Sequence, residues 1–437
     1  MKSYAPAIAF ALAVPSLVAH APQSAPDEIR RLNLYSFLTE AGRANLDIAA
    51  ARFNITVAEA QLAIERLFPD PGFSLGVSSI ELYGPSKEGS VAQYNAGLGW
   101  TLELGGKRAA RMDFANSMLS AATLEFEAFL LEWYFDAAVL FIDAQKAKWR
   151  CEELGKIHRG LLDKVALNEA RYVADSTYEA ELALSRMEAR KYEAGVLLAE
   201  AEARVAHMAL AQLMGPDTQP FALGGELNFP HPNIDHEQIL AAALSRCPRL
   251  LAARQNIELA NSGLRLAKAN RWVDLGLHVG LSHTPTGPIS GINHERSLMS
   301  NTLSAGISVP LPFSRRHKGE LIQAGASLSQ AKVELSSVEL KKQYETLSAL
   351  EQYEATLDAV KAFQKDVLSN SDKVLEASRL NYREGRISLM EFISTQQVCI
   401  EAHLSYIDAR INYAKALAHL GKVAGGRVFG EWLSVDN

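Results

Sequence analysis

The chain has 437 residues, enough for one large domain or two to three ordinary ones. Its 44 Lys and Arg residues against 50 Asp and Glu residues give a formal net charge of −6, so nothing points to nucleic acid as a partner. Apolar residues make up 48% of the chain, which excludes a disordered protein. The three cysteines, Cys151, Cys247 and Cys399, are far apart and form no CxxC motif, which argues against a disulfide framework and a structural zinc site.

The N-terminus has the pattern of a targeting segment. Lys2 is the only charged side chain before Asp27, and the apolar run that follows it is interrupted by prolines. Ala19-His20-Ala21 has the small-x-small form of a signal-peptidase site. We interpret residues 1–21 as a cleaved secretory signal, with a disordered N-terminal tail as the alternative. Beyond residue 30 no stretch of about 18 apolar residues occurs, so hydrophobic helices are not expected to cross a membrane.

The remaining chain is predicted to be an internal duplication of one structural unit, over residues 22–234 and 235–437, with a short C-terminal tail. Ala50-Ala51-Arg52-Phe53-Asn54-Ile55 aligns with Ala252-Ala253-Arg254-Gln255-Asn256-Ile257, and at similar spacing Tyr172 matches Tyr382 and Gly215 matches Gly425. Because strands and turns match as well as helices, a duplicated architecture explains the pattern better than chance similarity between Ala-rich helices.

Each unit is predicted to contain a helix, two strands, a very long helix, a turn and a further helix. The first helices span about residues 26–68 and 235–271, and the long helices about 107–171 and 316–383. Some 65 helical residues make a rod of roughly 100 Å, a length typical of coiled coils. The helix over about 177–214 is near half that length, and the Gly- and Pro-rich segment 215–232 is expected to form a connector at mid-height.

The strands alternate strictly between apolar residues and small or polar ones. The alternation covers 94–104, 273–281 and 303–311, close to the roughly 9–11 residues that cross a bilayer as a tilted strand. The alternative, an amphipathic sheet packed on a soluble core, is disfavoured because the long rods leave no free face for it. The residues predicted to face lipid are Leu98, Trp100, Leu102, Val279, Leu281, Ile307 and Val309.

Four strands cannot close a barrel, and an open edge in lipid would leave backbone groups unpaired. Closure needs at least about 8 strands, so two copies are the minimum and three give a wider lumen. A signal peptide together with a β-barrel indicates a bacterial-type outer membrane.

These features together resemble the TolC-type outer-membrane factor family, the outer membrane efflux proteins, over essentially the whole mature chain. Two strand-to-helix junctions are similar to the cobalt–zinc–cadmium (CzcC-like) branch: Leu102-Glu103-Leu104-Gly105-Gly106-Lys107-Arg108, and Val309-Pro310-Leu311-Pro312-Phe313 with Gly319. The resemblance implies a mainly α fold with a membrane β part, in which a homotrimer forms an α-helical tunnel continuous with a 12-strand outer-membrane β-barrel, four strands per protomer.

The same resemblance implies a passive exit duct in the bacterial outer membrane with a large periplasmic part. Its partners would be outer-membrane lipid, a periplasmic adaptor (membrane fusion protein) and an inner-membrane pump of the resistance-nodulation-division class, with heavy-metal cations as cargo. The alternatives are a duct for drugs or other small molecules, and a periplasmic coiled-coil scaffold without a channel.

The family's tunnel tip carries an R-[FY]-x-x-G-x-x-x-x-x-[DE] motif, which both halves match in part. In the second half Asn381 replaces the Arg, Gly385 suits a turn with positive φ, and Glu391 supplies the acid. In the first half Asp175 replaces the Gly, and Asp tolerates that backbone less well. The resemblance implies a tunnel constriction at Glu391, Arg386, Tyr382 and Glu181, and adaptor-docking tips at Asp175, Ser176, Thr177, Gly385, Ile387 and Ser388. A solvated helix face is the alternative for Glu391.

No motif predicts catalysis or a cofactor. Gly105-Gly106-Lys107-Arg108 lacks the earlier Gly and the Ser or Thr of a P-loop, and no nucleophile–base arrangement appears. His283 and His294 fall in a Pro- and Gly-rich segment that is expected to form an extracellular loop, where histidines without a function are favoured over a weak metal site.

Overall fold

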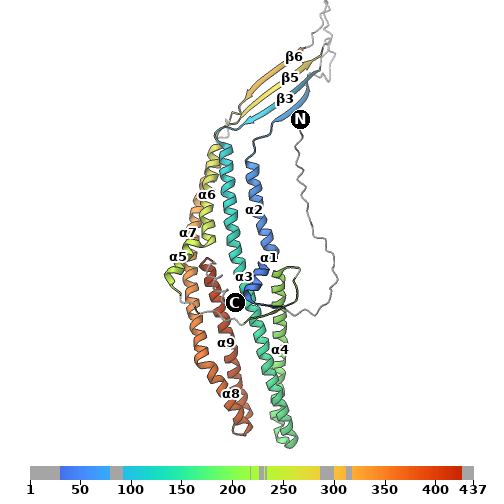
Figure 1. Ribbon diagram of the computed structural model, residues 1–437, viewed down its shortest axis with the longest axis vertical. Helices are drawn as coiled ribbons and strands as arrows, with labels where there is room; N and C mark the ends of the chain where they lie inside the picture. The colour runs from blue at the N-terminus through green and yellow to red at the C-terminus, as the bar shows by residue number, and fades with distance from the viewer. Residues whose placement is uncertain are drawn as a thin grey trace, which may run out of the picture.

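A computed structural model describes residues 30–78, 92–216, 218–225, 231, 234–285, 300–311 and 317–425. The predicted signal segment 1–21, the C-terminal tail from residue 426 and His294 lie outside the described residues. The molecule is long and narrow, with the large sheet at one end, helices running along most of its length, and two helical hairpin tips at the other end (Figure 1).

The two halves of the chain contribute similar series of elements. The first contains β1 (Arg30–Leu32), α1 (Leu34–Ala44), α2 (Leu46–Glu65), β2 (Gly72–Ser78), β3 (Gln93–Leu102), α3 (Lys107–Ala174), the 3₁₀ turn η1 (Ser176–Tyr178), α4 (Glu179–Met214) and β4 (Phe221–Leu223). The second contains α5 (His236–Arg246), α6 (Pro248–Ala269), β5 (Leu275–Thr284), β6 (Ser300–Ser308), α7 (Lys318–Ala362), the π-helix η2 (Phe363–Val367), α8 (Leu368–Arg383) and α9 (Leu389–Val423).

The first helix of each half is broken in two, contrary to the single helices predicted over 26–68 and 235–271. Asn45 ends α1 in an extended conformation, and its side chain accepts hydrogen bonds from the backbone N–H groups of Asp47 and Ile48 to start α2. In the second half Cys247 is extended and Pro248 opens α6 at its first position. A side-chain cap and a proline therefore cause the two breaks.

The two long helices differ from each other. α3 is a continuous helix of 68 residues, about 100 Å long, as predicted. Its predicted counterpart over 316–383 is α7, then the π-helix η2, then α8, so the second rod is interrupted at Phe363–Val367. A π-helix accommodates an extra residue and is one of the recognised causes of a bend in a long helix.

The four-stranded sheet is antiparallel with the order β2-β3-β5-β6. Leu98 lies opposite Val279, and Trp100 lies opposite Leu277, which in turn lies opposite Ile307. Because directly opposite residues share a face, apolar rows run across the whole sheet. The strand ends differ slightly from prediction: Val309 lies just beyond β6, and His283 lies inside β5 rather than in a loop.

α1 and α5 lie beside the long helices at the middle of the molecule (Figure 1). Together with β1, which directly precedes α1, and β4 they form what we call the belt. β1 and β4 form a parallel pair that was not predicted, with Leu32 opposite Leu223. The largest hydrophobic cores lie at this level: one packs Phe37 of α1 against Phe141 of α3, and the other contains Tyr353 of α7 and Leu417 of α9. The belt therefore supplies the buried apolar side chains that thin pairs of helices cannot provide by themselves.

Candidate functional site

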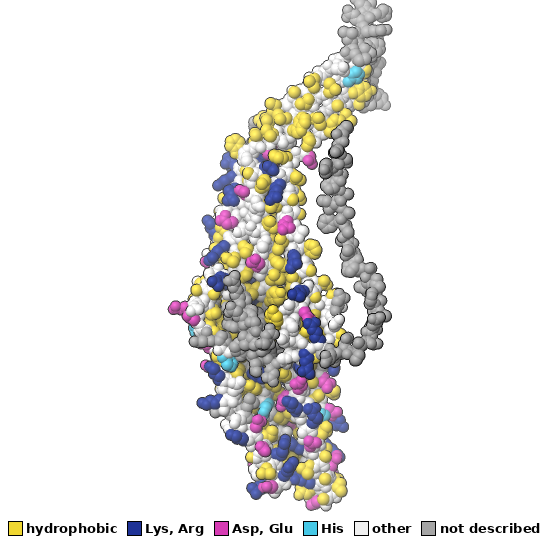
Figure 2. All heavy atoms as spheres, viewed as in Figure 1, with side chains coloured by type: hydrophobic (Ala, Val, Ile, Leu, Met, Phe, Trp, Pro, Cys, Tyr) yellow, Lys and Arg dark blue, Asp and Glu magenta, His cyan; other side chains and the backbone are white. Residues whose placement is uncertain are grey.

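One face of the sheet presents apolar side chains to the surroundings. Hydrophobic side chains cover the sheet in Figure 2, whereas Lys, Arg, Asp and Glu side chains are distributed over the helices. No Lys, Arg, Asp or Glu occurs in β2, β3, β5 or β6. The seven residues predicted to face lipid are all exposed in the protomer, and six of them lie on strands with their side chains on one face: Leu98, Trp100, Leu102, Val279, Leu281 and Ile307.

The opposite face of the sheet is small and polar. Gly97 lies opposite Gly280, and His278 is flanked by Gly99 and Gly306, so the imidazole covers a glycine. Ser304, opposite Gly280, donates its hydroxyl hydrogen to the Gly280 carbonyl at 3.3 Å. The sheet therefore separates an apolar surface from a surface that water or a polar solute can contact.

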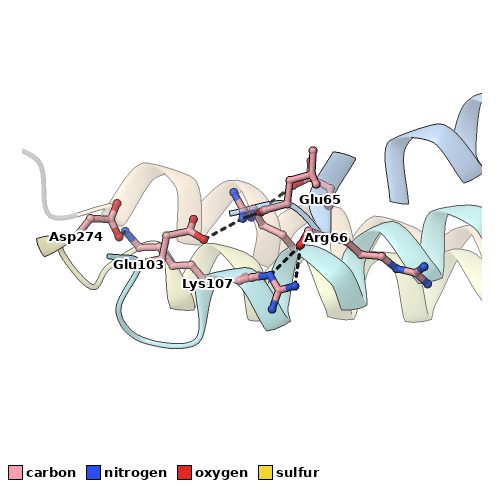
Figure 3. A network of polar contacts seen from close by, with 8 residues as sticks. Glu65, Arg66, Glu103, Lys107 and Asp274 are labelled. Carbon is pink, nitrogen blue, oxygen red and sulfur yellow. Dashed lines mark hydrogen bonds and ion pairs between the residues drawn. The ribbon is translucent and has the colours of Figure 1, made fainter. Parts of the chain in front are cut away.

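A network of charges holds the sheet to the helices (Figure 3). Arg111 of α3 donates to the carboxylate of Glu103, just after β3, at 2.9 Å, and lies 3.4 Å from the carboxylate of Glu65 on α2. Lys107, the first residue of α3, pairs with Asp274, just before β5, at 2.7 Å. These contacts join α2, β3, α3 and β5, and they fix the direction in which the helices leave the sheet.

Arg108 closes the C-terminal end of α2. Its guanidinium donates two hydrogen bonds to the Arg66 carbonyl, at 3.0 and 2.7 Å, and lies over the ring of Phe68 at 4.0 Å. The last carbonyls of a helix lack partners within the helix, so a cation there is stabilising. The Leu102–Arg108 junction segment thus has an observed structural role in this chain.

The two tip turns use different backbone conformations. Gly385 has a φ of 72°, the positive φ predicted for the second turn. Asp175, which stands at the position of this glycine in the first half, has a φ of −152°, and its carboxylate accepts a hydrogen bond from the Thr177 N–H. Hydrogen bonds from the backbone N–H and the side chain of Thr177 lower the pKa of Asp175. The first tip is therefore a capped 3₁₀ turn, which requires no glycine.

Tyr382 and Glu181, two of the predicted constriction residues, lie together. Tyr382 is 5% exposed, and its hydroxyl donates to Asn168 at 2.9 Å and lies 3.3 Å from the Glu181 carboxylate. The Arg171 guanidinium lies 4.9 Å from the Tyr382 ring centroid and 4.0 Å from Glu181. Burial raises the pKa of Tyr382, so its hydroxyl keeps the proton that it donates. This cluster, the tip knot, connects the α3–α4 hairpin to α8.

Glu391 and Arg386 do not join the tip knot. Arg386 pairs with its neighbour Glu384 at 2.8 Å, and the exposed Glu391 is the third residue of α9, where its backbone N–H donates to the Ser388 hydroxyl. Among the predicted docking residues, Asp175, Ser176, Thr177, Gly385 and Ser388 are exposed and Ile387 is half-buried. The four predicted constriction residues thus form one pair within the protomer and two separate surface positions.

Sequence reasoning missed several residues next to the tip knot. Lys164 of α3 lies over the Phe392 ring at 4.0 Å and donates to Gln396, both on α9. Burial and the nearby Arg379 lower the pKa of Lys164 to about 7. Asn168 follows Leu161 by two helical turns on the same buried face of α3. A polar residue at a buried position in an apolar stripe is the signal that could have identified Asn168.

The described part of the chain shows neither a metal cluster nor a membrane-spanning helix. No three or more His, Cys, Asp or Glu side chains in it are placed to hold a metal ion. None of the described helices has an apolar stretch long enough to cross a bilayer.

Comparisons with known proteins agree with this arrangement. Residues 239–426 match the family described as outer membrane efflux protein, and a comparison with curated protein sequences gives no significant match. The crystal structure of CusC covers 94% of this chain and 96% of its own at 16% identity and a TM-score of 0.74. The Campylobacter jejuni CmeC outer membrane channel covers 92% and 89% at 17% identity and a TM-score of 0.73. The open state of the Neisseria gonorrhoeae MtrE outer membrane channel covers 92% and 94% at 18% identity and a TM-score of 0.73.

The chain therefore has the fold of these outer-membrane channels. The match to the outer membrane efflux protein family covers residues 239–426, which lie in the second half of the chain. The mainly helical architecture with few strands is confirmed, whereas the homotrimer, the 12-strand barrel, the internal duplication and the CzcC-like branch stay predictions.

Proposed function

We propose that this protein is the exit duct of a tripartite efflux system, a passive channel rather than an enzyme, formed by three copies of the chain. It is located in the bacterial outer membrane, with its helices in the periplasm. One observation carries the proposal: the sheet has an apolar face and two free edges, β2 and β6, in the described structure. Backbone groups at a free edge cannot stay unpaired in lipid, so β2 of one copy pairs with β6 of the next.

The helices support the same lateral association. The free side of α2 carries exposed Leu46, Phe53, Val57 and Ile64, at the spacing of one helix face. The side of α7 at the other end of the protomer carries exposed Ile322, Val333, Leu340, Tyr344 and Leu347. Two different apolar edges make a head-to-tail interface, which closes into a ring when the rotation between copies permits it. Three copies with four strands each give the twelve strands of the proposed barrel.

The helical tips are the proposed docking site for the periplasmic adaptor, which joins the duct to an inner-membrane pump of the resistance-nodulation-division class. They lie at the end of the helices farthest from the sheet (Figure 1). Their exposed polar residues, Asp175, Ser176, Thr177 and Ser388, leave hydrogen-bonding groups for a partner. The tip knot around Tyr382 and Glu181, with Glu391 and Arg386 on the surface, is the proposed constriction.

Heavy-metal cations are the proposed cargo, because the two strand-to-helix junctions resemble the cobalt–zinc–cadmium branch. A passive duct needs only a wide polar lumen, so the cargo does not have to be recognised by a metal site on this chain. Drugs or other small molecules are the alternative cargo. A periplasmic scaffold without a channel is the alternative function, and the uncharged strands with their apolar face disfavour it.

The test combines location, assembly and transport. We expect the protein in the outer-membrane fraction, migrating as a trimer that heat converts to a monomer, and forming conducting channels in planar bilayers. Deletion of the gene should raise sensitivity to cobalt, zinc or cadmium more than to a panel of drugs. A soluble periplasmic protein without conductance would refute the duct, and sensitivity to drugs alone would refute the metal cargo.

A further inference from the structure

Each of the four strand–helix connections of the protomer carries a cation that no acidic side chain of the described structure pairs. They are Arg66 between α2 and β2, Arg108 as the second residue of α3 after β3, Arg271 between α6 and β5, and Lys318 as the first residue of α7 after β6. Arg66, Arg271 and Lys318 are exposed, and Arg108 is half-buried against the end of α2. We name these four residues the cationic collar. The cationic collar has one residue next to each of the four strands, two from the first half of the chain and two from the second.

The acidic groups nearest to the collar are mostly engaged elsewhere. Glu65 and Glu103 bind Arg111, Asp274 binds Lys107, and Glu320, two residues after Lys318, lies 3.5 Å from His317. The exposed Asp70 lies in the same connection as Arg66 and forms no ion pair within the described residues. Positive charge therefore exceeds negative charge at the level where the uncharged strands end.

Exposed aromatic rings accompany the collar. Phe68, two residues after Arg66, is 70% exposed, and Trp272, directly after Arg271, is 64% exposed. Aromatic rings with long cationic side chains beside them are typical of the boundary between hydrocarbon and lipid headgroups, where the ring lies in the apolar layer and the cation reaches the phosphates.

We propose that the cationic collar binds the phosphate groups of anionic phospholipids in the periplasmic leaflet of the outer membrane. The inference rests on the proposed function, since it places the four strands across that membrane. Charge complementarity and the position of the collar at the end of the apolar face identify the ligand. In a ring of three copies, the collar would set the depth of the barrel and the level at which the helices leave the membrane.

Phosphatidylglycerol and phosphatidylcholine of equal chain length are the probes, added to the purified, detergent-solubilised protein and counted by native mass spectrometry. The test variant combines Arg66→Gln, Arg271→Gln and Lys318→Gln. Arg108 is kept, because it also closes α2. The control combines Lys332→Gln, Lys341→Gln and Lys373→Gln, three exposed lysines of α7 and α8 that form no ion pair in the described structure. The two variants have the same net charge.

The wild type and the control are expected to prefer phosphatidylglycerol, and the test variant is expected to lose about fivefold of this preference for each cation removed. An unchanged preference in the test variant would overturn the proposal. The proposal would also be overturned if the test variant kept its lipid preference but changed the cation-to-anion permeability ratio of the channel. The collar side chains would then face the lumen and not the lipid. Lipid binding is measured in detergent and does not depend on conductance. If the protein formed no conducting channels in planar bilayers, that result would therefore contradict the proposed duct but not the lipid preference of the collar.

Discussion

Removing the Tyr382 hydroxyl group tests whether the polar contacts of the tip knot hold the tip closed. In Tyr382→Phe the ring still stacks on Phe392, whose centroid lies 5.2 Å away, but the hydrogen bond to Asn168 is lost. The contact of the hydroxyl with Glu181, 3.3 Å away, is lost as well. The apolar packing of the tip is unchanged, so the variant isolates the polar contacts between α8 and the α3–α4 hairpin.

The magnitude follows from the burial of Asn168. Its side chain is fully buried, its amide nitrogen has no hydrogen-bond partner among the residues that the structure describes, and its oxygen would lose the partner it has. A buried polar group left without a partner costs about 1–3 kcal/mol. The Glu181 carboxylate is partly exposed and can bind water in place of the lost hydroxyl, so it adds little to this free-energy cost. If opening the tip breaks this contact, the equilibrium shifts toward the open state about 5- to 150-fold, at about 1.4 kcal/mol per factor of ten.

The assay is single-channel open probability in planar bilayers, with trimer yield measured in parallel. Tyr172→Phe is the matched control, because Tyr172 is the predicted counterpart of Tyr382 in the first half and is 37% exposed. The double variant Tyr382→Phe with Asn168→Leu should recover part of the closed state, since neither side then buries an unpaired polar atom. Equal open probability in wild type and Tyr382→Phe would refute the assignment of the tip knot to gating.

Four further predictions concern other parts of the molecule. Ile307→Arg, on the apolar face of β6, should cost roughly 2–4 kcal/mol and reduce insertion, whereas Ser304→Arg on the other face should insert normally and change conductance; equal effects would contradict the membrane face. Gly385→Pro removes the N–H that donates to the Tyr382 carbonyl and cannot adopt a φ of 72°, so resistance should be lost with the trimer still inserted, while Gly385→Asn should keep both. Glu391→Gln should weaken block of the current by divalent cations added on the periplasmic side, and undiminished block would leave Glu391 as a solvated surface residue. The pKa of Lys164 is lowered from 10.5 to about 7, so the folded state gains stability as pH rises from about 7 to 10.5; thermal unfolding should lose this slope in Lys164→Met and keep it in the exposed Lys156→Met.

The strands were predictable because their signal is local. Alternation with period two places Leu98, Trp100 and Leu102 on one face whatever the rest of the chain does, and the sheet register agrees with it. The ends of the strands were less predictable, since His283 continues the alternation with a polar ring and was assigned to a loop. Three-residue strands such as β1 and β4 carry no periodic pattern at all, so a connector at mid-height was predicted but the strand pair within it was not.

The breaks in the helices have chemical causes that the sequence does contain. Asn45 is a good N-cap and Pro248 a good first helical residue, but both lie within longer helical patterns, and the periodicity concealed them. The π-helix at Phe363–Val367 has no such marker. We attribute it to tertiary packing, because α7 and α8 both pack along α9 and the Gln364 side chain donates to the Tyr406 hydroxyl at 3.3 Å. Register between two helices, which sequence alone does not specify, decides where the extra residue lies.

The same reasoning explains why the candidate site was only partly predictable. Tyr172 and Tyr382 occupy matching positions in the predicted repeat, yet only Tyr382 is buried and hydrogen-bonded across the interface. The difference follows from the turns beside them: Asp175 caps a 3₁₀ turn by itself, whereas the turn at Gly385 precedes a buried cluster of Leu389, Phe392 and Tyr382. An internal alignment predicts which residues are equivalent in the chain, but the contact between the two hairpins is one interface with two different sides. Tyr172 and Tyr382 therefore cannot both lie in the contact between these two hairpins. The sequence does not specify which of the two tyrosines is buried there, and the structure does.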